Sequence, residues 1–264
     1  MELVNSVGVI TGAASGIGAI VARQLAKRGV RLILGDRDET AVQEVASKIN
    51  DSGGESIGMK VDVTSQEECA ALADEAVKKF SKLNIVIPCA GIIADGLFLN
   101  TDSQTKKVKK KLSLEKWQSV LDINLTGTFL TVRESAEKMV NGGWPGVIIP
   151  ISSINKMGQI GQLNYSSSKA SLALFPKILV GEFLLRKIRN LRVVGIAPGY
   201  VKTPLLEKMN QDALVKLLSQ VHVGRLIEPD EIASLIQHII ENESLNGTTI
   251  EITGGLCFDG AIAK

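Results

Sequence analysis

The chain has little of what many catalytic and membrane-bound classes of protein require. It holds two histidines and three cysteines among 264 residues, so a histidine-based triad or a zinc site is not expected. The cysteines (Cys69, Cys89 and Cys257) lack Cys-x-x-Cys spacing, which favours free thiols in a reducing compartment. No apolar run approaches the roughly 20 residues of a membrane span, and the first residues show no signal or transit pattern. We therefore expect a cytoplasmic protein with no metal and no membrane partner.

Charge is nearly balanced as well, since 30 Lys and Arg against 28 Asp and Glu give a formal net charge of +2. Nucleic-acid binding needs a concentrated basic face, so we do not expect nucleic acid as a partner. A chain of this length, 45% apolar, can bury a large core in one α/β domain.

What is present is an alternation of short β-branched runs with longer helical stretches. We predict strands at 7–10, 31–36, 56–62, 85–88, 147–151, 192–197 and 249–252, and helices at about 16–29, 38–51, 65–80, 113–141, 163–188 and 228–241. Almost wholly apolar strands joined by helices are typical of a parallel sheet covered on both faces. The expected fold is a single Rossmann-type, doubly wound domain of about seven strands over residues 1–264, with ligands at the carboxyl ends of the strands.

Two segments interrupt this alternation. Residues 95–113 form a polar insertion that contains Lys106, Lys107, Lys109, Lys110 and Lys111. Residues 199–224 follow a Pro-Gly turn and are expected to form a short helical flap over the substrate. Long excursions in compact domains are often lids or binding loops, whereas the simpler interpretation of the lysine run is a solvated loop.

Tyr165 and Lys169 stand four residues apart on a predicted helix, and Ser152 precedes the tyrosine by thirteen residues. Side chains at i and i+4 share a helix face, so the ammonium can stabilise a phenolate. Lowering the pKa of a tyrosine from about 10 by roughly 3 units takes about 4 kcal/mol. The trio can therefore do acid–base chemistry on an alcohol or carbonyl without histidine or metal. The alternative is an ordinary amphipathic helix, because Tyr-x-x-x-Lys is common by chance.

A glycine-rich turn, Thr11 to Gly18, follows the first strand and opens a helix, where main-chain amides and the helix dipole favour a pyrophosphate. The second strand ends in Asp36, the expected position of an acid that binds the adenosine ribose. A carboxylate there favours NAD over NADP, although the guanidinium of Arg37 could bind a 2′-phosphate. The alternative for Asp36 is a helix N-cap. Asp62 ends the third strand in the same way, where an adenine edge would lie.

Taken together, these residues resemble the short-chain dehydrogenase/reductase family over essentially the whole chain. The motifs that carry the resemblance stand in the family's order: Thr11-Gly12-x-x-x-Gly16-x-Gly18, Asp62-Val63, Asn124, Ser152, Tyr165-x-x-x-Lys169 and Pro198-Gly199. Three further motifs are most similar to those of 3-oxoacyl-acyl-carrier-protein reductases: Gly161-Gln162-x-Asn164-Tyr165, Asn124-Leu125-x-Gly127, and Asn246-Gly247 with Gly254-Gly255.

The resemblance implies a role for each site residue. Tyr165 would be the general acid or base, Lys169 would lower its pKa and hold the nicotinamide ribose, and Ser152 would polarise the carbonyl. Asn124 would hold a water that resupplies the proton, or else be a buried amide that satisfies main-chain groups. Thr203 would bind the carboxamide, or cap a flap helix. The implied cofactor-binding set is Gly12, Ser15, Gly16, Ile17, Gly18, Asp36, Arg37, Asp62, Val63, Ala90, Gly91, Tyr165, Lys169, Pro198, Gly199, Val201 and Thr203.

The chain also departs from the family pattern. Pro88-Cys89-Ala90-Gly91 replaces the usual Asn-Asn-Ala-Gly, so two amide side chains that tie neighbouring loops together are missing. Pro176 interrupts the tyrosine helix, at a cost of about 3 kcal/mol unless a kink accommodates it. Arg186 matches a position at which carrier-protein reductases dock their partner, but Gly143 stands at another such position.

We therefore expect an NAD(H)-dependent oxidoreductase of fatty acid metabolism that interconverts 3-oxoacyl and 3-hydroxyacyl thioesters, as a homotetramer or homodimer, with NADP as the alternative cofactor. An acyl-carrier protein or CoA would carry the acyl group. A second enzyme hypothesis is a dehydrogenase of a small polyol or cyclic hydrophobic alcohol. Five apolar residues are expected to line the substrate pocket and favour a chain or ring over a sugar: Ile154, Met157, Ile160, Leu205 and Leu206. A non-catalytic nucleotide-binding regulator is the third hypothesis; such proteins usually lack the tyrosine or lysine that this chain retains.

Overall fold

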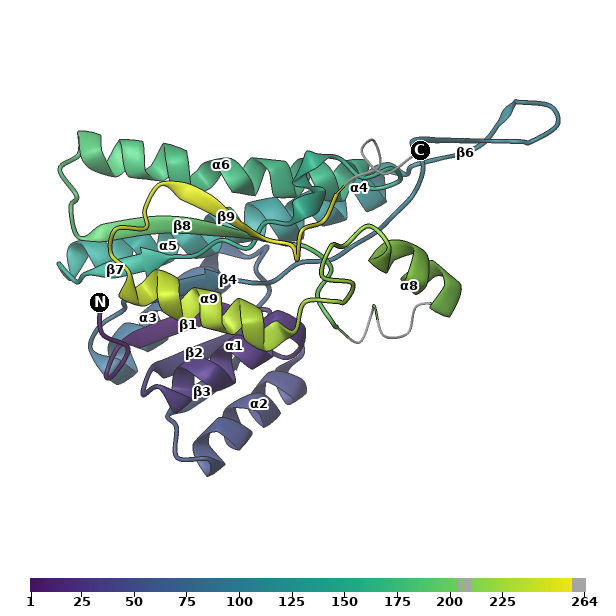
Figure 1. Cartoon of the computed structure of the whole chain (residues 1–264). Coiled ribbons are helices and arrows are strands. Elements are labelled where there is room, and N and C mark those ends of the chain that lie inside the picture. Colours follow the sequence, from purple (N-terminus) through teal and green to yellow (C-terminus); the bar gives the residue numbers. More distant parts are fainter. Residues whose placement is uncertain (204–205, 207–209, 258–264) are drawn as a thin grey trace.

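The computed structural model describes the chain except for residues 204–205, 207–209 and 258–264. At its centre lies a parallel sheet of seven strands in the order β3-β2-β1-β4-β7-β8-β9 (Figure 1). These are β1 (Val7–Thr11), β2 (Arg31–Asp36), β3 (Ser56–Lys60), β4 (Ile85–Pro88), β7 (Gly146–Ile148), β8 (Leu191–Pro198) and β9 (Thr248–Ile252). The strand order reverses between β1 and β4, and doubly wound sheets bind ligands at the carboxyl ends of the strands beside such a reversal. The predicted fold class is confirmed.

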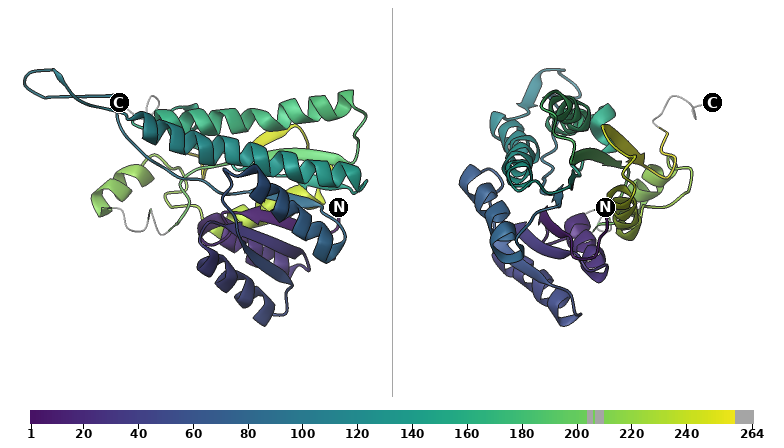
Figure 2. Two further views of the ribbon diagram at one scale, coloured as in Figure 1. Left: turned by 180° about the vertical axis from the view of Figure 1, so that it is seen from behind. Right: turned by 90° about the vertical axis from the view of Figure 1, so that its left-hand side faces the viewer.

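Helices cover both faces of the sheet and enclose two apolar cores (Figure 2). One layer holds α1 (Gly16–Lys27), α2 (Glu39–Asp51) and α9 (Pro229–Glu241), and the other holds α3 (Gln66–Phe80), α5 (Gly127–Asn141) and α6 (Leu163–Leu185). Neighbouring strand residues face opposite layers, as the pleat requires: Ile10 lies in the first core and Val9 in the second. The predicted helix at 113–141 is in fact divided into α4 (Leu114–Leu121), a π-helical turn (Asp122–Thr126) and α5.

Residues 95–113 form a β-hairpin that projects beyond the body of the molecule (Figures 1 and 2). Strand β5 (Leu99–Thr101) pairs antiparallel with β6 (Val108–Lys111), and every side chain of both strands is exposed. The carboxylate of Asp102 closes the turn by accepting from the amides of Gln104 and Thr105 at 2.8 and 2.6 Å, and it pairs with Lys109. The hydrogen bond from Lys109 and these amides lower the pKa of Asp102 to about 2. The expected insertion is exposed, but it is an ordered arm rather than an irregular loop.

In the segment 199–224, helix α8 (Gln211–Leu218) is described, and Val201 forms a bridge with Ile227. Leu205, one of the predicted pocket residues, lies outside the described residues.

Helix α6 continues through Pro176 because the neighbouring strands leave space for the proline ring and hydrogen-bond to the turn that precedes it. A proline inside a helix removes one N–H and crowds the preceding turn. The carbonyl of Ala173 in that turn accepts a hydrogen bond from the Thr249 hydroxyl on β9 at 2.9 Å. On β8, Gly195 leaves space for the ring, since a Cβ there would lie 3.3 Å from Pro176 Cγ. The helix thus remains whole as far as Leu185.

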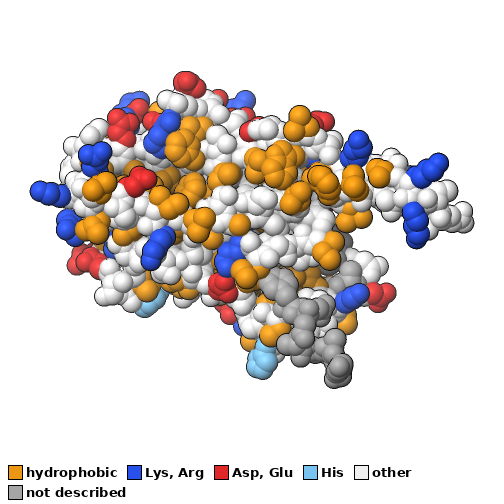
Figure 3. Space-filling view, turned by 90° about the horizontal axis from the view of Figure 1, so that it is seen from above, with side chains coloured by type: hydrophobic (Ala, Val, Ile, Leu, Met, Phe, Trp, Pro, Cys, Tyr) orange, Lys and Arg blue, Asp and Glu red, His pale blue; other side chains and the backbone are white. Residues whose placement is uncertain are grey.

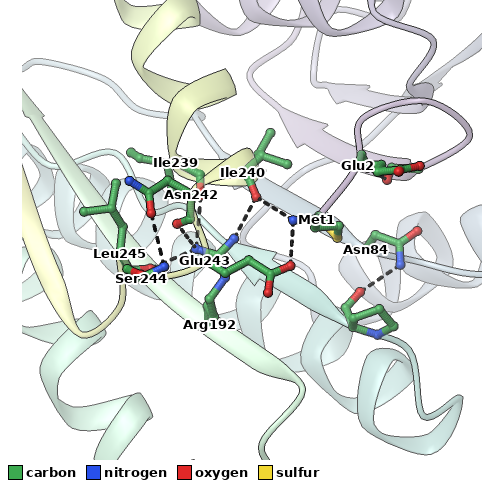
Figure 4. A network of polar contacts seen from close by, with 12 residues as sticks. Met1, Glu2, Asn84, Arg192, Ile239, Ile240, Asn242, Glu243, Ser244 and Leu245 are labelled. Atoms are coloured by element: carbon green, nitrogen blue, oxygen red, sulfur yellow. Dashed lines mark hydrogen bonds and ion pairs between the residues drawn. The ribbon is translucent and has the colours of Figure 1, made fainter.

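Arg192, at the start of β8, fastens the end of α9 to the sheet (Figure 4). Its guanidinium donates to main-chain oxygens at 2.8–3.3 Å, those of Ile239, Ile240, Asn242 and Leu245. A cation at a helix C-terminus satisfies unpaired carbonyls and the helix dipole. The amino group of Met1 joins the same network by donating to the Ile240 carbonyl at 3.4 Å, and it forms a 2.7 Å ion pair with Glu243. This clamp lies at the amino end of β8, opposite the carboxyl ends of the strands.

Candidate active site

The glycine-rich turn predicted for a pyrophosphate has the backbone that such a site needs. Gly16 has φ = +55°, and a Cβ at Gly18 would collide with the carbonyl oxygen of Gly12, so a side chain is excluded where α1 begins. Ser15 is the N-cap residue of α1, but its hydroxyl makes no capping hydrogen bond to the helix. The first amides of α1 therefore remain suited to an anion.

A cavity of about 580 Å³ lies over this turn. Most of the predicted cofactor residues line it, namely Gly12, Ser15, Gly16, Ile17, Gly18, Asp36, Arg37, Asp62, Val63, Ala90, Gly91 and Thr203. The other predicted residues line an adjoining cavity: Tyr165, Lys169, Pro198, Gly199 and Val201. A glycine turn, a helix N-terminus and a carboxylate that line one cavity fit a dinucleotide.

The carboxylate of Asp36 is held in place by two main-chain amides. Ala14 N–H donates to Oδ2 and Asp38 N–H to Oδ1, both at 3.0 Å. The N-cap of α2 is Asp38, which accepts from Ala41 N–H at 3.0 Å, so the interpretation of Asp36 as that N-cap is wrong. Asp36 is thereby fixed where a ribose would lie.

Asp62 lies at the same edge, after β3. The hydroxyl and amide of Thr64 donate to its carboxylate at 2.7 and 2.9 Å. These hydrogen bonds, with a smaller contribution from the charge of Arg37, lower the pKa of Asp62. The carboxylates of Asp36 and Asp62 therefore both line the first cavity.

Tyr165 and Lys169 project from the first turns of α6 into the adjoining cavity of about 430 Å³. The Lys169 Nζ lies 5.6 Å from the centre of the tyrosine ring and donates to the carbonyl of Ile151 at 2.8 Å. Burial lowers the pKa of Lys169 to about 8, with the neighbouring Cys89 acting in the opposite direction.

Burial also raises the pKa of Tyr165, a hydrogen bond with Ser153 lowers it, and the charge of Asp95 raises it. The expected lowering of this pKa by Lys169 is not found, because burial dominates and the ammonium is held by a carbonyl. The phenol therefore carries its proton at neutral pH.

Two adjacent serines follow β7, and the structure gives them different surroundings. The hydroxyl of Ser152 is buried and donates to the carbonyl of Lys169 at 2.6 Å. Ser153 instead forms the hydrogen bond with Tyr165, while its oxygen accepts from the amide of Asn155 at 3.1 Å. The serine beside the phenol is thus Ser153, not Ser152 as predicted. Spacing from the tyrosine alone could not distinguish two adjacent serines.

Asn124 lies in the π-helical turn between α4 and α5 and is fully buried. Its side chain accepts from Ile92 N–H at 2.8 Å and donates to the Ile92 carbonyl at 3.0 Å. The interpretation as a buried amide that satisfies main-chain groups is confirmed, and the bound water stays a prediction. A Cβ on Gly91 would lie 3.3 Å from Asn124 Oδ1 and 3.7 Å from Lys169 Nζ, so these two residues flank the same loop.

The loop that replaces Asn-Asn-Ala-Gly finds its support elsewhere. The main-chain amide of Cys89 donates to the Thr11 carbonyl at 3.2 Å, and that of Ala90 to the Thr11 hydroxyl at 3.4 Å. Together with Asn124, Thr11 takes the place of the missing amides. Burial raises the pKa of the Cys89 thiol to about 12, so it is present as the neutral thiol.

The wall of the second cavity differs from the prediction. Ile154 is buried in the core, Met157 and Ile160 are exposed, and none of the three lines the cavity; Leu206 does. The same loop contributes three amide side chains instead, those of Asn155, Gln159 and Gln162, and the apolar lining includes Ile92, Ile93 and Leu217. Gln162 belonged to a recognised motif, but no sequence signal separated inward from outward residues in this short turn.

Thr203 lines both cavities. Its alternative role, as the cap of a following helix, concerns residues 204–209, most of which lie outside the described part of the chain.

The sequence pattern of the short chain dehydrogenase family matches residues 6–214. The chain belongs to this family. The family's enzymes use a nicotinamide cofactor, NAD or NADP, and act on secondary alcohols and ketones, so the chain is an oxidoreductase of this kind.

Several relatives align with nearly the whole chain. It is 31% identical to the 3-oxoacyl-[acyl-carrier-protein] reductase of Aquifex aeolicus, covering 97% of this chain and 99% of that protein. It is 35% identical to 3-hydroxyacyl-CoA dehydrogenase type-2 of Drosophila melanogaster, covering 96% of this chain and 97% of that protein. It is 33% identical to the cis-4-hydroxycyclohexanecarboxylate dehydrogenase of Sinomonas cyclohexanicum, covering 94% of this chain and 95% of that protein. The resemblance to 3-oxoacyl-acyl-carrier-protein reductases is thereby confirmed.

A solved short-chain dehydrogenase/reductase from Serratia marcescens has the same fold, with a TM-score of 0.84 and 23% identity over 97% of this chain and 99% of that one. Within the ranges that the structure describes, no helix is long and apolar enough to cross a membrane. Nor do three or more His, Cys, Asp or Glu side chains gather there as metal ligands.

Proposed function

We propose that the protein is an NAD(H)-dependent oxidoreductase that interconverts 3-oxoacyl and 3-hydroxyacyl thioesters. One observation carries the proposal: Tyr165 and Ser153 lie in a cavity that joins the dinucleotide cavity. The two share Ile17, Cys89, Gly91, Ile92 and Thr203 as lining residues. A carbonyl bound beside the phenol would therefore lie next to the end of the first cavity, where a nicotinamide supplies or accepts a hydride.

The chain's own side chains would handle the proton. Tyr165, protonated at neutral pH, donates it to the carbonyl oxygen during reduction and takes it back during oxidation. Ser153 donates a hydrogen bond to the same oxygen as negative charge develops there, because its oxygen is already oriented by the amide of Asn155. Lys169 binds ribose hydroxyls and stabilises the phenolate that remains after proton transfer. Asn124 holds the loop around Gly91 in place and, with a bound water, would return the proton.

NAD is the proposed cofactor because of the fixed carboxylate of Asp36. Its two oxygens accept from the ribose 2′- and 3′-hydroxyls, whereas a 2′-phosphate would bring like charges together at a cost of about 1–4 kcal/mol. Arg37 is exposed on the same rim and lies close enough to Asp62 to influence its titration. Two neighbouring carboxylates thus compete with a phosphate for this guanidinium.

The thioester part of the proposal draws on the relatives and on the arm at 95–113. Leu99 to Lys111 carries five exposed lysines on a hairpin whose base is tied to the mouth of the substrate cavity, because Gly96 N–H donates to Gly161 O at 2.8 Å. An acyl chain in the cavity would leave its phosphate-bearing CoA near this arm. Arg186 ends α6, about 30 Å along the helix from Tyr165, so within one chain it is remote from this mouth. Coenzyme A is therefore favoured over an acyl-carrier protein.

A second candidate function is the oxidation of a cyclic alcohol. It is supported by the similarity to the cis-4-hydroxycyclohexanecarboxylate dehydrogenase. The apolar residues Ile92, Ile93, Leu206 and Leu217 could enclose a ring as well as an acyl chain.

We further propose that single-domain subunits assemble as a homotetramer or homodimer, and that residues 199–224 close over the substrate. The proposed location is a reducing, cytoplasmic compartment, and the proposed role is in fatty acid metabolism. Figure 3 shows apolar side chains along the face that α6 presents to solvent. Leu174, Ile178 and Leu185 on α6 are exposed, as are Leu114 on α4 and Phe129 on α5. A second copy that packs on this face would bury them, since exposed apolar patches often mark protein–protein contacts.

A substrate panel with NADH and NADPH tests the proposed function. It compares 3-oxoacyl-CoA, 3-oxoacyl carrier protein, cyclic ketones and small free ketones by kcat/KM. The proposal expects the highest value for NADH with 3-oxoacyl-CoA, and a higher value for a cyclic ketone would establish the second candidate instead.

A further inference from the structure

Asn164 lies directly before Tyr165, in a motif to which the proposed function gives no role. It stands in the first turn of α6, where main-chain amides have no partner inside the helix, and the N-cap residue Gln162 makes no side-chain hydrogen bond to them. The side chain of Asn164 supplies one such bond, since the amide of Tyr165 donates to its Oδ1 at 2.9 Å. Asn164 thus holds the backbone of Tyr165 directly.

The nitrogen of the same side chain reaches two other segments. Nδ2 donates to the carbonyl of Ala94 in the loop after β4 and to the carbonyl of Lys116 in α4, both at 3.0 Å. Asn164 is fully buried, so water does not compete for these contacts. Its side chain therefore ties α4, the loop after β4 and the start of α6 together at one point.

The loop after β4 forms part of the wall of the cavity that holds Tyr165. Ile92 and Ile93 line that cavity, and Asn164 holds the loop at the next residue, Ala94. The wall of the cavity and the helix that carries the phenol are thus fixed to the same amide side chain.

Only an amide satisfies this position in full. The oxygen of Asn164 accepts one hydrogen bond, and both hydrogens of its nitrogen are donated. A carboxylate of the same shape could not donate, and a serine hydroxyl has a single hydrogen for the two carbonyls. Buried polar networks in which every member is paired hold one geometry.

We propose that Asn164 is a positioning residue for the reaction, which sets the distance between the phenol of Tyr165 and the cavity wall against which the ketone binds. This inference rests on the proposed role of Tyr165 as the acid. A reacting group displaced by about 1 Å can slow a reaction about 10²-fold, so loss of these bonds should lower kcat. Affinity for the coenzyme should stay the same, because none of the three partners of Asn164 lines the dinucleotide cavity.

Asn164→Asp tests the proposal with a side chain of the same shape. When protonated, the new carboxyl can donate to one carbonyl and accept from the amide of Tyr165; when ionised, it can donate to neither carbonyl. Burial raises the pKa of such a group. In the reduction of the best ketone of the substrate panel, kcat of the variant divided by that of wild type should fall at least about tenfold from pH 6 to pH 9. The Kd of the coenzyme should change less than about twofold.

Other groups near this position carry charge or titrate as well. They are present in both proteins, so taking the ratio at each pH separates their titration from that of the new carboxyl. These groups are Asp95, Lys116, Tyr165 and Lys169.

Asn84→Asp is the matched control. Asn84 is also buried, accepts from Val7 N–H at 3.2 Å and donates to the Pro145 carbonyl at 2.8 Å, at the amino ends of the strands (Figure 4). Both variants should lose unfolding free energy as the pH rises, because the folded state holds the proton of the buried carboxyl more tightly than the unfolded chain does. Only Asn164→Asp should also lose kcat.

A kcat of Asn164→Asp within about twofold of wild type from pH 6 to pH 9, or an equal loss of kcat in Asn84→Asp, would overturn the role of Asn164 and leave the proposed function standing. If Asn164→Asp does not fold, Asn164→Ser leaves room for a water and should lower kcat at least about tenfold at unchanged coenzyme affinity. An undiminished kcat in that variant would overturn the role too. An undiminished kcat in Tyr165→Phe would instead refute the proposed function.

Discussion

The hydroxyl of Ser152 donates a hydrogen bond to the main-chain carbonyl of Lys169 across 2.6 Å. This bond joins the end of the central sheet to the second turn of α6, the helix that carries Tyr165. Both partners are buried, so the bond holds the phenol at a fixed distance from the strand ends. Ser153, the next residue, is then free to meet the phenol with its own hydroxyl.

Alanine at each serine should therefore have a different effect. Ser153→Ala removes a hydrogen bond that strengthens as charge develops, and kcat should fall about 10²–10³-fold with little change in thermal stability. Ser152→Ala removes a buried hydrogen bond from a carbonyl that keeps its helical partner, and should cost about 0.5–1.5 kcal/mol of folding free energy, with a smaller loss of kcat. Steady-state kinetics and urea unfolding of the two variants measure this directly. The assignment is wrong if Ser152→Ala shows the larger loss of kcat at unchanged stability.

The fixed carboxylate of Asp36 predicts the preference between coenzymes. Asp36→Ala should weaken NADH binding, because two ribose hydroxyls lose their acceptor, and should improve NADPH binding, because Arg37 can then meet the 2′-phosphate. The kcat/KM values for both coenzymes measure the change. Asp38→Ala, which removes the N-cap of α2, is a matched control that should alter stability but not the ratio. A wild-type preference for NADPH would contradict the proposed cofactor.

Replacing lysines of the arm at 95–113 by neutral residues should change KM only for substrates that carry phosphate groups. The change is Lys→Gln at Lys106, Lys107, Lys110 and Lys111; Lys109 is kept because it pairs with Asp102 in the turn. We expect KM for 3-oxoacyl-CoA to rise and its dependence on salt to flatten, since exposed charges act on the encounter with the ligand. Turnover of a small uncharged ketone should stay the same.

A pair of lysines on α3, Lys78 and Lys79, offers the control, because they are also exposed and lie on a different element. Their replacement by Gln should change neither KM. Equal effects of the arm variant on charged and uncharged substrates would mean that the arm only supports local structure.

The buried ammonium of Lys169 predicts a pH-dependent stability. Its pKa is about 8 in the folded protein against 10.5 for an ordinary lysine, so the unfolded chain binds the extra proton more tightly. The folded state therefore loses about 3 kcal/mol below pH 8, and this loss disappears as the pH rises to about 10.5. Lys169→Met should be more stable than wild type at pH 7, by a margin that shrinks toward pH 10. A constant difference between the two unfolding free energies from pH 7 to pH 10 would exclude this account.

The parts of the fold and site that the sequence predicted are those with a local signal. Short apolar runs such as 85–88 between helical stretches indicate buried strands, and Tyr165 with Lys169 share a helix face at any register. The ends of neighbouring parallel strands meet at one edge, which made Asp36 and Asp62 neighbours of the glycine turn.

Other features depend on contacts that no local pattern encodes. Ser152 and Ser153 are chemically identical, and only the packing against α6 decides which of them meets the phenol. In the short turn after them, Ile154 faces the core and Asn155 the cavity because one turn of 3-10 helix sets their directions. The arm forms strands although it is rich in lysine, because Asp102 closes its turn.

The phenol of Tyr165 offers the most direct test of the proposed chemistry. Tyr165→Phe removes only the hydroxyl, so the ring keeps its packing and Lys169 keeps its bond to Ile151. In the proposed function the phenol supplies the proton and contributes little to cofactor binding, so kcat for ketone reduction should fall at least about 10²-fold, with the Kd of NADH changed less than about twofold. Measured together by steady-state kinetics and by fluorescence titration of NADH, these two quantities decide the matter. A residual kcat above about a tenth of wild type, at unchanged NADH affinity, would show that Tyr165 is not the acid.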